Sequence, residues 1–103
     1  MIELTFNGLR KANVVRCESV FHLLNCWSPS EWACALAGEA GETCNAVKTL
    51  NRGDGTVEAI AAELADTVIY ADLLAARLGI DLGAAVRAKF NEVSEKRGST
   101  VRL

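Results

Sequence analysis

Four stretches of helical periodicity, separated by helix-boundary residues, most constrain how this chain of 103 residues can fold. No stretch alternates apolar and polar residues in the way that a half-buried strand does. The clearest boundary is Ser28-Pro29-Ser30-Glu31, where a capping Ser precedes a Pro at the first helical position and a Glu stands three residues after the cap. We therefore expect helices over about 6–25, 29–51 and 57–78, and a fourth helix from the cap Asp81 to near Gly98.

Short connections between the last three helices predict antiparallel neighbours and hence an all-α four-helix bundle, formed by a single domain over residues 1–103. The first helix has Thr5 as an available N-cap, but Asn7, Gly8 and Asn13 lower its helix propensity. Half of the residues are apolar, and most of these are Ala, Leu and Val. Because so thin a core often needs a partner subunit, we expect oligomerisation to complete the bundle.

The charge pattern argues against several classes of partner. Eleven basic and 13 acidic residues give a net charge of −2 without long runs of like charge, so neither a nucleic-acid polymer nor a membrane is an expected partner. Polar residues interrupt the first 25 positions, which leaves no signal-peptide core and predicts a cytoplasmic location. The four cysteines form no C-x-x-C pair, so reduced thiols are favoured over a zinc site.

Two pairs of acidic residues have the i, i+3 spacing that places side chains next to each other on a helix. They are Glu39 and Glu42 on the second helix, and Glu63 and Asp66 on the third. Antiparallel packing would bring the four together, where carboxylates about 5 Å apart repel by roughly 3 kcal/mol at an effective dielectric of 20. Protons or cations would have to compensate, and an all-oxygen ligand set favours Mg²⁺, with Mn²⁺ as the alternative ion.

Two other interpretations of these acids follow from the residues. Pairs of the E-x-x-E type are common on solvated helix faces, although both pairs here border apolar stripes. A di-iron carboxylate bundle would need two Glu-x-x-His elements, and the single histidine, His22, belongs to neither. His22 is therefore expected to be a partly buried residue of the first helix instead of a ligand.

The run Gly38-Glu39-Ala40-Gly41-Glu42, followed after 20 residues by Glu63-Leu64-Ala65-Asp66, resembles the MazG-like all-α NTP pyrophosphohydrolases. The signature of that family is E-x-x-E, a spacer, and then E-x-x-D. The resemblance extends from about Trp27 to Gly98 and leaves only the first helix without a motif. Many MazG proteins carry a further Glu at the position of Gly38. This chain lacks that Glu, as the dCTPase-like branch does. The identity of the general base therefore stays open between Glu39 and Glu42.

The resemblance implies that the chain hydrolyses a nucleoside triphosphate between the α and β phosphates, giving the monophosphate and pyrophosphate. It implies that the four acids bind Mg²⁺, that Tyr70, Lys89 and Asn91 contact the nucleotide, and that the protein is a homodimer or homotetramer with its active site at or near a subunit interface. Such an enzyme would serve housecleaning or control of nucleotide pools.

The residues themselves give four candidates for substrate binding, Tyr70, Lys89, Arg97 and Trp27, and leave an alternative open for each. Tyr70 lies four positions after Asp66 on the same helix face, where it is either a nucleotide contact or a core tyrosine. Lys89 and Arg97 suit phosphates but also suit a solvated surface. Trp27 is placed to stack on a base, whereas packing is the better interpretation of Trp32.

The alternative to an enzyme is a non-catalytic protein. The bundle is also compatible with a non-catalytic helical oligomerisation or interaction module. The base and sugar preference of an enzyme lies beyond a motif, because base discrimination depends on the contacts within the pocket.

Overall fold

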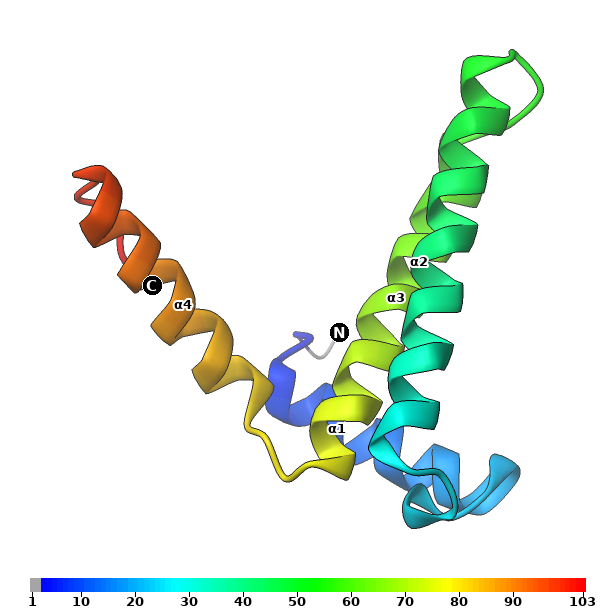
Figure 1. Cartoon of the computed structure of the whole chain (residues 1–103), viewed down its shortest axis with the longest axis horizontal. Coiled ribbons are helices and arrows are strands. Elements are labelled where there is room, and N and C mark those ends of the chain that lie inside the picture. The colour runs from blue at the N-terminus through cyan, green and yellow to red at the C-terminus, as the bar shows by residue number, and fades with distance from the viewer. Residues whose placement is uncertain (1–2) are drawn as a thin grey trace.

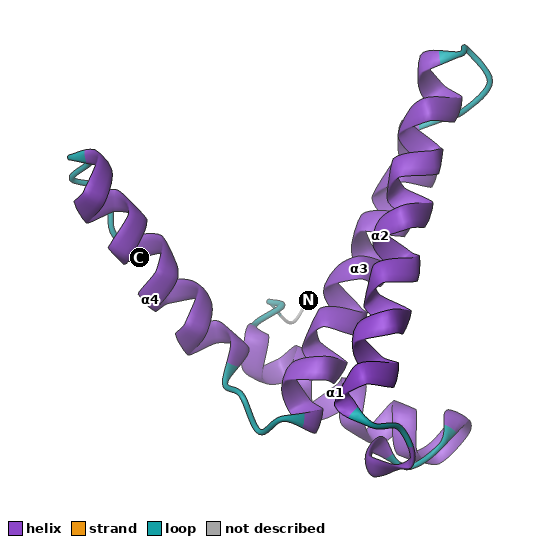
Figure 2. Ribbon diagram, in the orientation of Figure 1, coloured by secondary structure: helices purple, strands orange, loops and turns teal. Residues whose placement is uncertain are grey.

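The structure is a computed structural model that describes residues 3–103, and within that range every regular element is a helix (Figures 1 and 2). This confirms the predicted all-α class. The elements in chain order are α1 (Phe6–Arg16), the π-helical turn η1 (Cys17–Phe21), the 3₁₀ turn η2 (Leu24–Cys26), α2 (Pro29–Asn51), α3 (Val57–Arg77) and α4 (Leu82–Arg97).

The helix boundaries follow local capping chemistry. At the start of α2, the Ser28 hydroxyl accepts a hydrogen bond from the Glu31 amide, and the Glu31 carboxylate accepts one from the Ser28 amide, which is the predicted capping box. Thr5 caps α1 and Asp81 caps α4 through their side chains, also as predicted. The helix α4 ends at Gly98, whose φ of 71° lies in the left-handed region that glycine adopts at low cost.

The predicted extent of the first helix, to about residue 25, is wrong. Regular α-helix stops at Arg16, and the Cys17 carbonyl then accepts a hydrogen bond from the His22 amide at 3.0 Å, which widens the last turn into a π-helix. The chain becomes extended at His22, and the Glu18 carboxylate accepts a hydrogen bond from the amide of Leu24. The apolar residues beyond Arg16 therefore belong to a π-helical turn and the connection after it, and not to a continued α-helix.

The helices α2 and α3 form a long antiparallel hairpin, with α1 crossing its base (Figure 1). The buried residues Cys17, Trp32 and Leu73 lie where these elements meet, and Leu24, Trp27, Ile69, Tyr70 and Leu74 pack around them. The core is thus concentrated at one end of the hairpin, as expected for a chain with few large apolar side chains.

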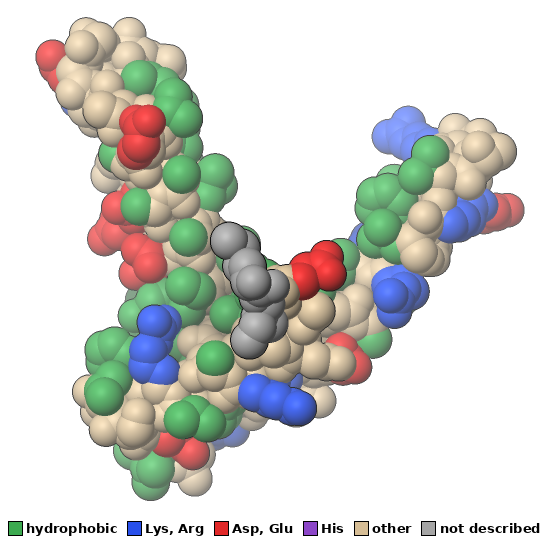
Figure 3. Space-filling view, turned by 180° about the vertical axis from the view of Figure 1, so that it is seen from behind, with side chains coloured by type: hydrophobic (Ala, Val, Ile, Leu, Met, Phe, Trp, Pro, Cys, Tyr) green, Lys and Arg blue, Asp and Glu red, His purple; other side chains and the backbone are tan. Residues whose placement is uncertain are grey.

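The helix α4 leaves this hairpin instead of packing along α3, so the chain forms an open V (Figure 1). Several apolar side chains of α4 are consequently exposed, among them Val86, Phe90 and Val93. Of the predicted antiparallel neighbours, α2 and α3 are thus paired within residues 3–103, whereas α4 does not pack beside α3 there. Figure 3 shows hydrophobic and basic side chains along the α4 arm and acidic side chains along the α2–α3 arm.

Candidate metal and ligand site

Carboxylates from the two helices of the hairpin converge near the middle of α2 and α3. One oxygen from each of Glu39, Glu63 and Asp66 lies within 4.8 Å of the other two. Glu42, the fourth predicted acid, lies close enough to Glu39 and Glu63 for its carboxylate to affect the pKa of both. The structure therefore brings together the four acids that the sequence singled out.

The surroundings of Glu39 and Glu63 disfavour negative charge on these two carboxyls. Burial is the largest cause of a raised pKa at Glu39, and the charges of Glu42 and Asp66 add to it. At Glu63, contact with the Glu42 carboxylate raises the pKa most, followed by burial. Each of these two side chains is half-buried and has one fully buried oxygen, Oε2, without a hydrogen-bond donor among the described residues. A buried carboxylate oxygen without a donor is costly and is normally paired or bound to a metal.

The donor set fits a hard divalent cation. It offers only carboxylate oxygens, which Mg²⁺ and Mn²⁺ prefer, and two of its residues, Glu39 and Glu63, each have a buried oxygen without a hydrogen-bond partner among residues 3–103. No nitrogen or sulfur ligand belongs to the group. On these grounds the residues are suited to hold magnesium, with Glu39, Glu63 and Asp66 nearest to one another and Glu42 beside them.

A pair of threonines links the two arms at the same level. The Thr43 and Thr67 hydroxyls lie 3.2 Å apart, and each also approaches the carbonyl of the residue four positions earlier, Glu39 or Glu63. Each arm thus carries the same pattern of Glu, a second acid three residues later and Thr one residue after that. The sequence analysis missed the threonines, although the E-x-x-E-T and E-x-x-D-T runs carry a visible repeat.

An aromatic cavity adjoins the acidic cluster. It has a volume of about 370 Å³, and Asp66 forms part of its wall. Its other lining residues come from α1, η1, the connection before α2, α2 itself and α3: Asn13, Arg16, Cys17, Phe21, His22, Trp27, Trp32, Ile69, Tyr70 and Leu73.

The rings in the cavity wall pack on one another at tilted angles. The ring centroids of His22 and Trp27 are 4.5 Å apart, those of Trp27 and Trp32 are 4.7 Å apart, and those of Trp32 and Tyr70 are 6.3 Å apart. Trp32 is buried, and its indole N–H donates to the Leu24 carbonyl, which agrees with its expected packing role. A rigid wall of this kind suits a flat aromatic ligand.

Trp27 and Tyr70, both predicted to bind substrate, line this cavity. Burial raises the pKa of the Tyr70 hydroxyl, the charges of Glu39 and Asp66 raise it further, and Arg16 opposes them. Tyr70 is therefore part of the aromatic wall and lies within reach of the charges of the acidic cluster. The partly buried position predicted for His22 is also observed, although its ring belongs to the cavity wall.

The three predicted substrate-binding residues of α4 lie apart from this site within the chain. Lys89 and Arg97 border the exposed apolar face of α4, and the Lys89 ammonium lies 3.6 Å from the Glu92 carboxylate. Asn91 forms two hydrogen bonds with the main chain of Leu103. None of the three lines the aromatic cavity.

Comparison of the chain with protein-family models, with curated proteins and with solved structures finds no match. Among residues 3–103, no helix combines the length and the apolar character needed to cross a membrane.

Proposed function

We propose that this protein is a Mg²⁺-dependent nucleoside triphosphate pyrophosphohydrolase that releases pyrophosphate and a nucleoside monophosphate. The observation that supports this most is the convergence of carboxylates from α2 and α3 beside an aromatic cavity, with two buried carboxylate oxygens lacking donors. The motifs over residues 38–42 and 63–66 resemble those of the MazG-like enzymes. Metal-binding acids next to an aromatic wall are the parts that phosphoryl chemistry on a nucleotide requires.

In this proposal, Glu39, Glu42, Glu63 and Asp66 hold magnesium, which when bound supplies positive charge for the phosphate oxygens. The acids of the pair on α2 are also the candidates for orienting the attacking water and accepting its proton. Separate substitutions of Glu39 and Glu42 would decide which of the two accepts the proton of the attacking water.

The aromatic cavity is assigned to the nucleobase. Trp27 offers a partly exposed ring for stacking, and Tyr70 lines the cavity close enough to Glu39 and Asp66 for their charges to raise its pKa. The cavity of about 370 Å³ falls in the range of small-ligand pockets, whose walls are mostly apolar with a few polar groups. A base held there would direct its phosphates toward the carboxylates through Asp66, which belongs to both the cavity wall and the acidic cluster.

We further propose that a homodimer or homotetramer completes the bundle. The exposed apolar stripe of α4 supports this, because isolated apolar helix faces of this kind usually pack on a partner. The open V leaves α4 free to lie along the hairpin of a second copy (Figure 1). In that arrangement Lys89, Asn91 and Arg97 would reach nucleotide bound to the partner chain.

The test is a pyrophosphate-release assay on the eight common ribo- and deoxynucleoside triphosphates, together with modified nucleotides, in millimolar Mg²⁺. We expect release from at least one substrate, and loss of release in Glu42→Gln and Asp66→Asn at unchanged helical circular dichroism. Glu58→Gln is the matched control, because Glu58 is an exposed acid of α3 outside the cluster. Retained turnover in both site variants would contradict the proposed roles, and no turnover by the wild type on any substrate would favour the oligomerisation module.

A further inference from the structure

Among the residues that the structure describes, 3–103, Arg16 is the only lysine or arginine that lines the aromatic cavity. It ends α1 and directly precedes the π-helical turn η1, whose residues Cys17 and Phe21 line the same cavity. Single π-turns cost stability and are frequent at functional sites. The wall of the cavity on this side is therefore built from a segment whose backbone departs from regular helix.

The guanidinium of Arg16 has no protein partner among residues 3–103. Its side chain takes part in no ion pair and no hydrogen bond there, although Asp66 lines the same cavity. Its main-chain carbonyl accepts from Ser19, but that contact does not involve the side chain. By contrast, Arg10 and Arg77, which also lie near the base of the hairpin, are both held by hydrogen bonds to other elements. Arg16 is thus free to bind a ligand in the cavity.

The electrostatic position of Arg16 points to a particular part of that ligand. Arg16, Asp66 and Tyr70 line the same cavity, so a ligand held there meets one cation and one acid of the cluster. A phosphoryl group in this cavity would be attracted by the positive charge of Arg16, which does not depend on a bound metal. A guanidinium that can donate two parallel hydrogen bonds is well suited to attract and orient a phosphoryl group.

We infer that Arg16 contacts a phosphoryl group of the nucleotide whose base occupies the aromatic cavity. This inference rests on the proposed function and adds to it a binding residue from α1, the one helix without a recognisable motif. The class of ligand is therefore a planar aromatic ring joined to a phosphate, and the affinity for the phosphate depends on a residue outside the acidic cluster.

The test compares binding of the four common deoxynucleosides with binding of their 5′-monophosphates, measured without divalent cations by calorimetry and by fluorescence of Trp27 and Trp32. The wild type should bind at least one monophosphate more tightly than its nucleoside. Arg16→Gln should weaken that monophosphate about tenfold or more, as expected for loss of a charged hydrogen bond, and change nucleoside affinity less than twofold. The monophosphate affinity of Arg16→Lys should lie between those of the wild type and Arg16→Gln. The control is Lys11→Gln, because Lys11 is an exposed cation of α1 outside the cavity, and its monophosphate affinity should match that of the wild type.

Unchanged monophosphate affinity in Arg16→Gln, or an equal loss for nucleoside and monophosphate, would overturn the inference, as would a wild type that binds neither. Pyrophosphate release by the wild type decides the proposed function separately. If the wild type releases pyrophosphate but Arg16→Gln binds monophosphates as tightly as the wild type, the proposed enzymatic function stands and only the role of Arg16 is contradicted. Circular dichroism checks that each variant is folded, which we expect because the Arg16 side chain has no contact that holds the fold.

Discussion

The carboxyls of Glu39 and Glu63 hold their protons more tightly in the folded chain than in the unfolded chain. Both have a raised pKa, through burial at Glu39 and through contact with Glu42 at Glu63. A raised carboxyl pKa means that the folded state binds more protons than the unfolded state between the two pKa values. Stability therefore falls as the pH rises through that window, and the loss is complete above the folded-state pKa.

The first prediction follows from this sign. In the absence of divalent cations, the melting temperature should rise as the pH is lowered from 7 toward the ordinary carboxyl value of 4.5. Glu63→Gln should raise the melting temperature at pH 7 and flatten the rise, because the amide carries no charge at any pH in that range. In Glu58→Gln, the melting temperature should change with pH as steeply as in the wild type. Parallel slopes for the wild type and Glu63→Gln would show that the acids do not repel one another.

At the level of single residues, spacing was enough to predict the four acids, because i and i+3 positions share a helix face whatever the surroundings. It was not enough to predict Arg16 or Thr67. Arg16 lines the cavity because α1 gives way to a π-turn, and no residue pattern announced that turn. The pairing of Thr67 with Thr43 depends on the relative register of α2 and α3, which the sequence of either helix does not specify.

Between elements, the pairing of Thr43 and Thr67 fixes that register next to the acids. Thr43→Val keeps the shape of the side chain and removes the hydroxyl, so we expect a loss of about 1 kcal/mol in the free energy of unfolding measured with urea. Thr49→Val is the matched control, since the Thr49 hydroxyl also approaches the carbonyl four residues earlier but meets no residue of α3. An equal effect of the two substitutions would argue that the contact between the arms contributes nothing.

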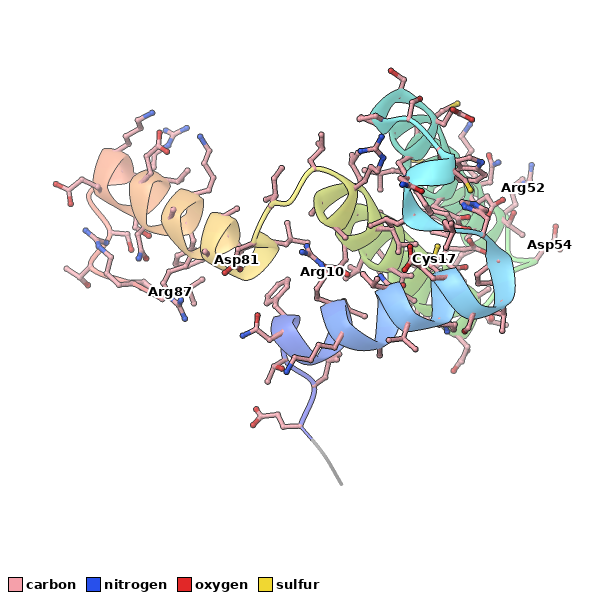
Figure 4. All side chains as sticks on the ribbon, turned by 90° about the horizontal axis from the view of Figure 1, so that it is seen from below. Arg10, Cys17, Arg52, Asp54, Asp81 and Arg87 are labelled. Carbon is pink, nitrogen blue, oxygen red and sulfur yellow. The ribbon has the colours of Figure 1, made fainter. Side chains whose placement is uncertain are left out.

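The helices α1 and α3 are joined by a buried polar group of three side chains. Asp72 is 1% exposed, and it accepts hydrogen bonds from Arg10 and Asn13, each at 3.0 Å. Figure 4 shows Arg10 at the junction of α1 with the segment that leads from α3 to α4, where it also donates to the carbonyl of Ile80. The sequence analysis missed this group, because a lone acid in the apolar half of α3 gives no sign of its partners.

Removing Asp72 should be costly because it leaves a partly buried arginine without its carboxylate. We expect Asp72→Ala to lower the free energy of unfolding by about 3 kcal/mol, at the lower end of the range for broken buried pairs since a quarter of the Arg10 side chain is exposed. Asp54→Ala, in the exposed turn after α2, should change it by less than about 0.5 kcal/mol. A loss no larger at Asp72 than at Asp54 in urea unfolding would contradict a structural role for the buried group.

At the scale of the whole molecule, the number of helices and most of their ends could be predicted from caps, proline and glycine. The direction of α4 could not. The short link after α3 suggested an antiparallel neighbour, but Gly79 adopts a φ of 69° and Arg10 holds the Ile80 carbonyl, which directs the chain away from the hairpin. Contacts distant in sequence decide such an angle. The same limit applies to the assembly, which depends on surfaces that a helical pattern does not pair.

The exposed stripe of α4 gives a prediction about assembly. We expect sedimentation to show that the wild type is a dimer or tetramer. Phe90→Asp should shift the oligomeric state toward the monomer, because the substitution would bury a charge in the interface. Ala88→Asp adds the same charge to an exposed position on the opposite face of α4 and should leave the assembly intact. A wild type that sediments as a monomer would contradict the proposed completion of the bundle.

The central claim is that acids of α2 and α3 together bind a divalent cation, and thermal unfolding with increasing Mg²⁺ tests it most directly. A cation that binds only the folded protein should stabilise it by about 2.7 kcal/mol at a hundredfold excess over its dissociation constant. We expect the melting temperature to rise with Mg²⁺ for the wild type and for Glu58→Gln, and to rise much less for Asp66→Asn. Identical melting of the wild type with and without millimolar Mg²⁺ would contradict the claim.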